Sequence, residues 1–244
     1  MEYLFTGKES IKNINEWKEI FTKNQNKKDH WKEGRSAYEL ANFMLNKNGE
    51  NTVKHFLEKA LNEEIILLKG YIEFEVKFDK YNHGREHDLG IWGKTNSNKT
   101  IFVGIESKVD ESFNETVKEV YIKNIVKELK GEKTNTPKRI ENLLKRNFTI
   151  ISERQFEIRY QLLYSTVGTI DAMENKKYAD IPIFLIIVFK SKAYDSNKGE
   201  KNYKDFLYFI KEINAQKIFK GKNKEMYKIN IGEKNLYIGH LIIE

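Results

Sequence analysis

Residues 87–113 read HDLGIWGKTNSNKTIFVGIESKVDESF, and the fold that we expect for the chain follows from this stretch. Two mostly apolar runs, His87 to Trp92 and Thr100 to Val109, flank the polar turn residues 95–98. Short runs rich in β-branched and aromatic residues, bounded by Gly, Asn and Ser, are typical of strands. A connection this short makes two strands antiparallel. The stretch therefore predicts two neighbouring antiparallel strands.

Two charged side chains lie inside the second of these strands. Glu106 and Lys108 are two positions apart, so their side chains project from the same face. The apolar residues before them indicate a buried strand, where charged groups are unfavourable unless they are paired or used for chemistry. Pairing of the two strands around the turn also brings Asp88 close to Glu106. We expect Gly90 and Gly104 to leave space for a ligand or for close backbone approach.

Two carboxylates and a lysine in this arrangement suit phosphodiester hydrolysis. Carboxylate oxygens are the hard ligands that Mg²⁺ prefers, and the bound ion keeps several waters. Such an ion polarises the scissile phosphate and lowers the pKa of a bound water. A lysine ammonium group beside it orients that water or neutralises the transition state. The residues therefore indicate Asp88 and Glu106 as ligands of Mg²⁺, with Mn²⁺ as a substitute, and Lys108 as a catalytic group.

The sequence on either side extends these strands into an α/β (α+β) core. Residues 71–78 alternate apolar and charged positions, which predicts a third strand and completes an antiparallel three-strand meander. The nearly all-apolar run from Ile181 to Phe189 predicts a central strand that is covered on both faces. Residues 226–243 predict a hairpin. Apolar stripes at helical spacing predict helices at residues 36–45, 52–61, 115–129, 137–146, 154–174 and 204–213. The predicted sheet is mixed and flanked by helices.

Two local signals predict where the first helices begin. Ser36 and Glu39 fit a capping box, and Asn51 or Thr52 is expected to cap the second helix. Pro137 is typical of the first turn of a helix.

Length and composition are those of one domain over residues 1–244, with a core at about 35–190 and a C-terminal helix and hairpin at 200–244. The chain has no cysteine, which excludes disulfides and thiolate metal sites. We see no signal peptide and no apolar run of membrane-spanning length, so we expect a cytoplasmic protein without membrane contact. The net charge of +7 and pI of about 9.1 are compatible with a polyanionic partner.

Asp88, followed by Glu106-Ser107-Lys108 on the next strand, resembles the PD-(D/E)XK nuclease superfamily. That superfamily has a core of a helix, an antiparallel three-strand meander, a helix and a further strand, which is the order expected here. The resemblance implies a restriction-endonuclease-like core in which Asp88 and Glu106 bind the metal and Lys108 serves catalysis. His87 stands where the superfamily pattern has proline. The segments 31–37 and 159–163 also resemble an uncharacterised bacterial family of this superfamily.

The resemblance further implies a carboxylate from the first helix and a polar residue from the helix after the third strand. Glu39 and Gln161 are the candidates for these two positions. Glu64 competes with Glu39, since its phase continues the inward stripe of the second helix. The capping box is a complete structural explanation for Glu39. Gln161 could equally lie in a packing seam of small residues.

The function implied by the resemblance is a Mg²⁺-dependent deoxyribonuclease, an endonuclease of the restriction or defence type, with DNA as its partner. The residues alone indicate only phosphodiester and metal chemistry. Two alternatives stay open, a non-catalytic nucleic-acid-binding relative and an RNA-processing nuclease. In the first alternative, Glu106 and Lys108 form a structural ion pair. The sequence leaves the recognition site and the oligomeric state open, a homodimer included.

Overall fold

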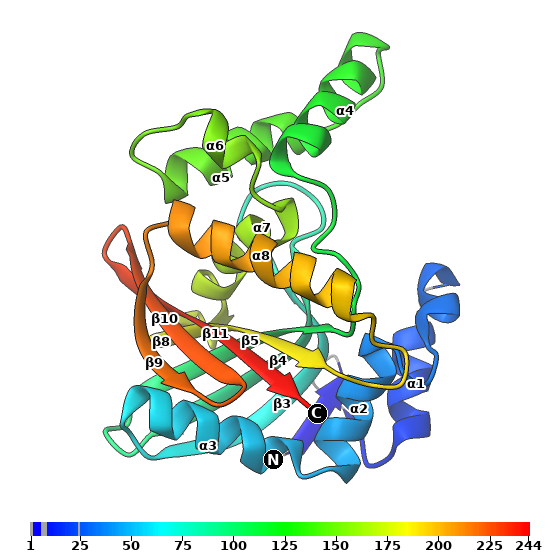
Figure 1. Ribbon diagram of the computed structural model, residues 1–244, viewed down its shortest axis with the longest axis vertical. Coiled ribbons are helices and arrows are strands. Elements are labelled where there is room, and N and C mark those ends of the chain that lie inside the picture. The colour runs from blue at the N-terminus through cyan, green and yellow to red at the C-terminus, as the bar shows by residue number, and fades with distance from the viewer. Residues whose placement is uncertain (1, 6–8, 24) are drawn as a thin grey trace.

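The computed structural model of the protein describes residues 2–5, 9–23 and 25–244. One mixed sheet runs through the described residues, with helices on both faces (Figure 1). Its strand order is β2-β1-β3-β4-β5-β8-β11-β10-β9. The predicted α+β fold, a mixed sheet flanked by helices, is confirmed.

The strands and helices follow one another along the chain in alternating groups. The strands are β1 (Glu2–Phe5), β2 (Glu9–Ser10), β3 (Ile65–Val76), β4 (Arg85–Thr95), β5 (Thr100–Lys108), β6 (Met173–Glu174), β7 (Lys177–Tyr178), β8 (Ile181–Phe189), β9 (Gln216–Gly221), β10 (Lys224–Ile231) and β11 (Lys234–Ile243). The helices are α1 (Ile14–Thr22), the 3-10 helix η1 (Gln25–His30), α2 (Ser36–Asn46), α3 (Gly49–Leu61), α4 (Val117–Leu129), α5 (Thr136–Asn147), α6 (Glu153–Phe156), α7 (Tyr160–Ile170) and α8 (Ser196–Glu212).

Strands β3, β4 and β5 form the predicted antiparallel meander, with Gly90 opposite Gly104. The first strand is longer than predicted and begins at Ile65 rather than at residue 71. A register shift between Leu67 and Lys69 interrupts the alternation of residues there, so the two-residue period does not reveal this part of the strand.

The centre of the sheet is parallel. β8 matches the predicted strand from Ile181 to Phe189 and lies between β5 and β11, in parallel to both. The predicted C-terminal hairpin is confirmed as β10 and β11, and β9 extends it by a third antiparallel strand. Because helices cover both faces of the sheet at β8, this strand needs a near-continuous run of Ile, Leu, Val and Phe.

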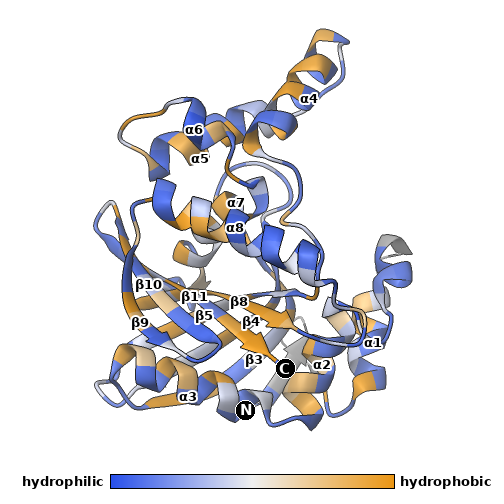
Figure 2. Ribbon diagram, in the orientation of Figure 1, coloured by the Kyte–Doolittle hydropathy of each residue, from blue (hydrophilic) through white to orange (hydrophobic). Residues whose placement is uncertain are grey.

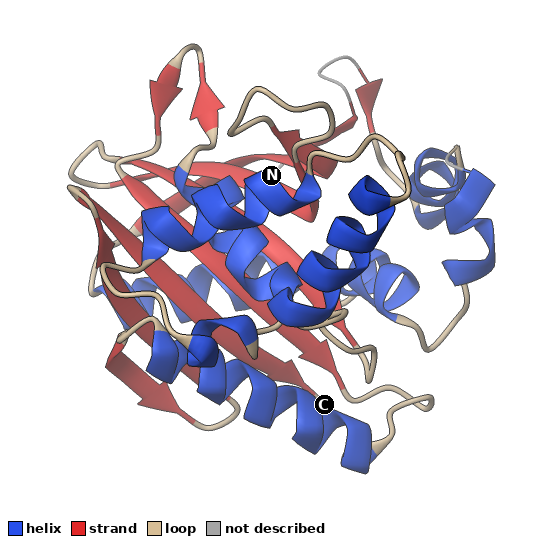
Figure 3. Ribbon diagram, turned by 90° about the horizontal axis from the view of Figure 1, so that it is seen from above, coloured by secondary structure: helices blue, strands red, loops and turns tan. Residues whose placement is uncertain are grey.

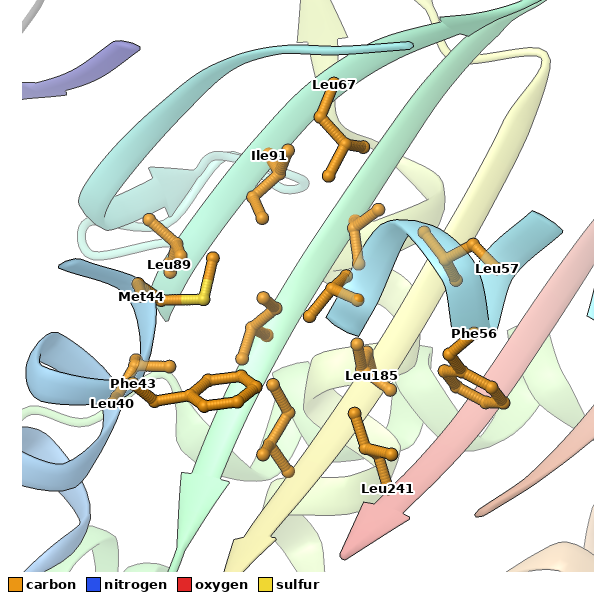
Figure 4. Packing of buried hydrophobic residues seen from close by; sticks show 14 of the residues in the cluster. Leu40, Phe43, Met44, Phe56, Leu57, Leu67, Leu89, Ile91, Leu185 and Leu241 are labelled. Atoms are coloured by element: carbon orange, nitrogen blue, oxygen red, sulfur yellow. The ribbon is translucent and has the colours of Figure 1, made fainter. Parts of the chain in front are cut away.

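Apolar side chains fill a layer on each side of the sheet. Figure 4 shows the first layer, in which α2 and α3 pack against the strands. Its labelled members are Leu40, Phe43, Met44, Phe56, Leu57, Leu67, Leu89, Ile91, Leu185 and Leu241. On the opposite face α7 and α8 bury Leu162, Leu163, Phe206 and Phe209. Figure 3 shows helices on both faces of the sheet. Each such side chain contributes about 1.5–3 kcal/mol of transfer free energy when fully buried.

The helix predicted at residues 154–174 is wrong as one element, because the chain breaks between α6 and α7. Arg159 has an extended backbone, with φ −66° and ψ 123°, and forms a bridge with Thr116. The backbone N–H of Val117 donates to Ile158 O at 2.8 Å, and that of Tyr160 donates to Glu115 O at 3.1 Å. This pairing with a distant segment overrides the helical spacing of the apolar residues.

The predicted start of α2 at Ser36 agrees with the structure, but the predicted capping box does not form, and the predicted start of α3 is wrong. Arg35 occupies the N-cap position of α2 without a side-chain cap, and Glu39 Oε1 accepts from Gly34 N at 3.1 Å. Helix α3 begins at Gly49, directly after Asn48 in the left-handed conformation (φ 58°). α8 begins at Ser196, earlier than predicted, because Asp195 caps it by accepting from the backbone N–H groups of residues 197 and 198.

Helix α4 projects from the body of the molecule together with the start of α5 (Figure 1). Apolar residues lie along this exposed helix (Figure 2), and Leu129 at its end is 82% exposed. Its predicted apolar stripe enters the core only at Val117. Among the described residues, no helix combines the length and apolarity needed to cross a lipid bilayer.

One histidine of the sheet makes stability depend on pH. His240 in β11 is buried against Tyr203 and Phe206, and burial lowers its pKa to about 4. Below about pH 6.5 the unfolded chain binds a proton at this site that the folded chain does not bind, so stability falls towards pH 4. In His240→Phe we expect the pH slope of the unfolding free energy to decrease by about 1.4 kcal/mol per unit in this window. Urea unfolding at a series of pH values measures both slopes, and equal slopes would contradict this assignment.

Candidate active site

A cleft of about 760 Å³ lies at one end of the meander, between the strands and the segment from α1 to α2. The candidate residues Asp88, Glu106, Lys108 and Gln161 all line it. The acidic residue Glu73 of β3 also lines the cleft, although no sequence pattern predicted it.

Strand register places three carboxylates in one row. Ile72 pairs with Leu89 and Phe74 pairs with His87, so Glu73 and Asp88 occupy opposite positions of β3 and β4. The pairing of Leu89 with Ile105 places Glu106 of β5 next to Asp88 on the other side. Three adjacent strands therefore each contribute one acidic residue to the cleft.

Glu106 is almost completely buried, at 3% exposure, and three side chains contact its carboxylate. Lys108 Nζ lies 2.8 Å from Oε1, Gln161 Nε2 donates to Oε1 at 2.6 Å, and Arg85 Nη2 donates to Oε2. Burial acts to raise the pKa of Glu106, but the charges of Lys108 and Arg85 hold it below its ordinary value. Glu106 is therefore ionised at neutral pH.

Asp88 has fewer compensating partners than Glu106. Its Oδ2 accepts from Ser107 N at 2.8 Å and from Ser107 Oγ at 2.6 Å. Burial, followed by the charge of Glu106, raises the pKa of Asp88 to about 6. The two carboxylates thus repel each other across the β4–β5 pair, and a positive charge between them would relieve this repulsion.

Glu73 adds a third carboxylate in a backbone conformation that is rare for its residue type. Its φ of 52° lies in the left-handed region, which is strained for a residue with a side chain. Burial and the charge of Asp88 raise the pKa of Glu73 to about 8, while the Lys27 ammonium group, which pairs with it, acts to lower the value. No feature of the alternating sequence at 71–78 distinguishes Glu73 from Glu75, so the sequence contained no signal for it.

Close packing of α7 against β4 and β5 brings Gln161 to Glu106. A Cβ added at Gly168 of α7 would lie 2.5 Å from Arg85 Cβ, and one added at Gly104 would lie 2.6 Å from His87 Cε1. A Cβ at Gly90 would meet the ring of Phe74 at 2.7 Å. The space at Gly90 and Gly104 that we expected for a ligand or backbone is therefore filled by these side chains.

Glu39 and Glu64, the competing helix carboxylates, do not line the cleft. Glu39 Oε1 accepts from Gly34 N, and its Oε2 lies 3.8 Å from Lys47 Nζ, so its contacts hold the start and end of α2. Glu64 lies just before β3, where its carbonyl oxygen accepts from Asn96 N. Neither side chain joins the row of Glu73, Asp88 and Glu106.

Basic side chains line the opposite side of the cleft. Lys27 and His30 come from η1, and Lys32 and Arg35 come from the connection to α2. Arg35 Nη1 pairs with Asp110 Oδ1 at 2.6 Å, whereas Lys32 is exposed and has no ion pair among the described residues. The cleft therefore combines an acidic floor with a basic edge.

The donor set at the floor fits a hard divalent cation. Among the described residues, no three His, Cys, Asp or Glu side chains already form a metal-binding group. Proteins commonly bind Mg²⁺ through one or two carboxylates, with waters and substrate phosphate as the other ligands. Asp88 and Glu106 supply two carboxylates, and burial, followed by the charge of Glu106, raises the pKa of Asp88. The residues present therefore fit Mg²⁺, or Mn²⁺ in its place.

Comparison with known proteins gives one match. A family model described as a domain of unknown function (DUF6946) matches residues 10–244. No curated protein and no solved structure matches the chain.

The electrostatic link between Glu73 and Asp88 can be measured directly. Asp88→Asn removes a negative charge beside Glu73 while keeping an oxygen for Ser107, so we expect the pKa of Glu73 to fall from about 8 towards its ordinary value. Carbon-13 NMR titration of the Glu side-chain carboxyl groups measures this change. Glu86→Gln is the matched control, since Glu86 raises the pKa of Glu73 less than Asp88 does. Equal shifts in the two variants would contradict the proximity of Glu73 and Asp88.

Proposed function

The chain belongs to the DUF6946 family, and we propose that it is a metal-dependent nuclease of the PD-(D/E)XK type, which hydrolyses phosphodiester bonds in DNA. The observation that carries this proposal is the row of carboxylates with Lys108 in one open cleft. Acidic residues on neighbouring buried strands are unfavourable for folding, so their placement favours a role in chemistry.

Each residue of the row has a distinct role in this proposal. Asp88 and Glu106 would hold Mg²⁺, and the bound ion would supply polarisation of the scissile phosphate and a lower pKa of a bound water. Lys108, fixed 2.8 Å from Glu106, directs its ammonium group at the phosphate and stabilises the charge that develops there. Gln161 donates to Glu106 Oε1 and orients that carboxylate as a positioning residue.

The basic edge of the cleft suits the phosphate backbone of the substrate. Exposed Lys32 and neighbouring Arg35 offer positive charge opposite the carboxylates, and the whole chain carries a net charge of +7. Lysine and arginine contacts to phosphates supply sequence-independent affinity. We place this activity on DNA in the cytoplasm, in an endonuclease of the restriction or defence type.

Two other functions are compatible with parts of the site. The contacts of Glu106 with Arg85, Lys108 and Gln161 favour a non-catalytic nucleic-acid-binding relative, because they also form a closed structural network. An RNA-processing nuclease would use the same metal chemistry. The raised pKa of Asp88 favours a cation-binding site over a purely structural network, since a structural network has no need for the second carboxylate.

The proposal predicts cleavage that depends on Mg²⁺ and on Lys108. Purified protein is incubated with supercoiled plasmid, linear DNA and RNA, with Mg²⁺ or EDTA. We expect Mg²⁺-dependent plasmid cleavage, its loss in Asp88→Asn, and a rate about 10²–10³-fold lower in Lys108→Met. Glu106 keeps Arg85 and Gln161 when Lys108 is removed, so the melting temperature should change little. Lys94→Met, at an exposed position of β4, is the control and should cleave at the wild-type rate.

The outcome distinguishes the three functions. A Lys108→Met variant that melts early and cleaves normally would identify Lys108 as a structural ion-pair partner. Nucleic-acid binding without cleavage in any metal would favour the non-catalytic relative, and cleavage of RNA alone would favour the RNA-processing nuclease.

The basic edge predicts a salt-dependent affinity for DNA. If Lys32 contacts one phosphate, Lys32→Ala should weaken binding and reduce the slope of log affinity against log salt by about 0.9. Fluorescence anisotropy with a labelled duplex in EDTA, over a range of salt concentrations, measures the slope. Lys94→Ala should leave the slope unchanged, and an equal effect of both variants would exclude a specific contact at Lys32.

A further inference from the structure

A second cavity, of about 210 Å³, adjoins the carboxylate cleft at Lys108. It lies beyond the carboxyl ends of β5, β8 and β11, where the first turns of α8 pass over them (Figure 1). Lys108 lines both cavities, and no residue of the acidic row lines the second one. A ligand whose phosphate contacts Lys108 can therefore extend a neighbouring group into the second cavity.

Four of the residues that line this cavity have aromatic rings, and the charged residues Lys190 and Glu200 line it as well. Phe113 lies with its ring centroid 5.5 Å from Lys108 Nζ, which places an aromatic wall directly beside the candidate catalytic group. Tyr203 and His240 contribute two more rings, with centroids 5.2 Å apart. Burial lowers the pKa of His240, so this ring is neutral at neutral pH. The faces of these uncharged rings suit a planar heteroaromatic group, which can stack or pack against them.

One buried polar side chain among these rings has an acceptor to spare. Asn202 is only 8% exposed and lines the cavity. Its Nδ2 donates to Glu111 O at 2.9 Å, while its Oδ1 has no hydrogen-bond partner among the described residues. Because Nδ2 is already bonded, the side chain is oriented with a carbonyl-type acceptor for a ligand. An acceptor of this kind on the wall of a cavity favours a ligand that brings an N–H group.

We propose that this cavity receives an unpaired nucleobase, adjacent to the phosphate that contacts Lys108, with a preference for bases that carry an exocyclic amino group. In a nucleotide one sugar separates the base from the phosphate. A nucleotide whose phosphate contacts Lys108 from the cleft can therefore place its base in the neighbouring cavity. Adenine, cytosine and guanine can donate from their amino group to Asn202 Oδ1, whereas thymine has no amino group. A base inside an intact duplex is paired and stacked, so the substrate class is nucleic acid with a single-stranded, overhanging or extruded nucleotide. This inference rests on the proposed nuclease function for the identity of its ligand.

Small ligands test the cavity without any cleavage. Titration of the wild-type protein in EDTA with 2′-deoxyadenosine 5′-monophosphate, followed by NMR, should shift the signals of residues around Asn202. 2′-Deoxyribose 5-phosphate lacks the base and should bind at least tenfold more weakly. 2′-Deoxynebularine 5′-monophosphate, in which a hydrogen atom replaces the amino group and the six-membered ring has no N–H donor, should bind about tenfold more weakly than the adenosine nucleotide.

A matched pair of substitutions locates the binding. Ser196 lies exposed on the rim and lines the cavity, whereas its neighbour Asn197 is equally exposed and does not line it. Ser196→Trp should fill the cavity and abolish the difference between the adenosine nucleotide and the sugar phosphate, while Asn197→Trp should keep it. The affinity of the wild type and of both variants is then measured for a duplex with a five-nucleotide single-stranded overhang and for the blunt duplex. Wild type and Asn197→Trp should prefer the overhang about tenfold, and Ser196→Trp should not.

Several outcomes would overturn this assignment. Equal binding of the adenosine nucleotide and the sugar phosphate by the wild type would exclude a base site without need of any variant. Unchanged base dependence in Ser196→Trp would place the base elsewhere. Base-dependent binding by the wild type without metal-dependent cleavage would contradict the nuclease proposal and retain the base site. Cleavage of blunt duplexes with no overhang preference would instead retain the nuclease and remove the base pocket.

Discussion

The compensation of one buried charge links the fold to the candidate site. Glu106 is ionised inside the protein, and Arg85 of β4, Lys108 of β5 and Gln161 of α7 share the stabilisation of its carboxylate. An uncompensated buried carboxylate destabilises a protein by several kcal/mol, so these elements must keep their relative positions. The antiparallel pairing of β4 with β5 and the close approach of α7 at Gly168 provide this arrangement. Stability and the geometry of the cleft therefore depend on the same contacts.

The row of carboxylates is compensated unequally along its length. Glu106 has three cationic or donor partners, Asp88 has the hydrogen bonds of Ser107, and Glu73 depends on Lys27 from η1. The pKa accordingly lies below its ordinary value at Glu106 and above it at Asp88 and Glu73. Glu106, at the β5 end of the row, is therefore ionised at neutral pH. The charge of Glu73, at the β3 end beside η1, changes with pH in the neutral range.

Local sequence patterns predicted the features that depend on neighbouring residues. The meander, the buried strand at 181–189 and the presence of Asp88, Glu106 and Lys108 in one cleft agree with the structure, because spacing on a strand and a short turn determine them. Gln161 also lines the cleft, but only the resemblance to the nuclease superfamily suggested it. Features set by distant contacts were missed. Glu73 depends on its position opposite Asp88 and on a left-handed backbone, and the break before α7 depends on the bridge between Thr116 and Arg159. The capping box at Ser36 failed because Glu39 accepts from Gly34 N instead.

The parallel pairing of β8 with β11 has a consequence for biosynthesis. β11 follows all the other strands in the chain, yet it lies inside the sheet between β8 and β10. While residues 234–243 are still being translated, β8 presents an unpaired apolar edge of Ile, Leu, Val and Phe residues. Exposed edges of this kind promote association between chains, and contacts between distant residues slow folding. The nascent protein therefore completes its central layer late, and truncation before Lys234 removes an internal strand and leaves β8 open on that side.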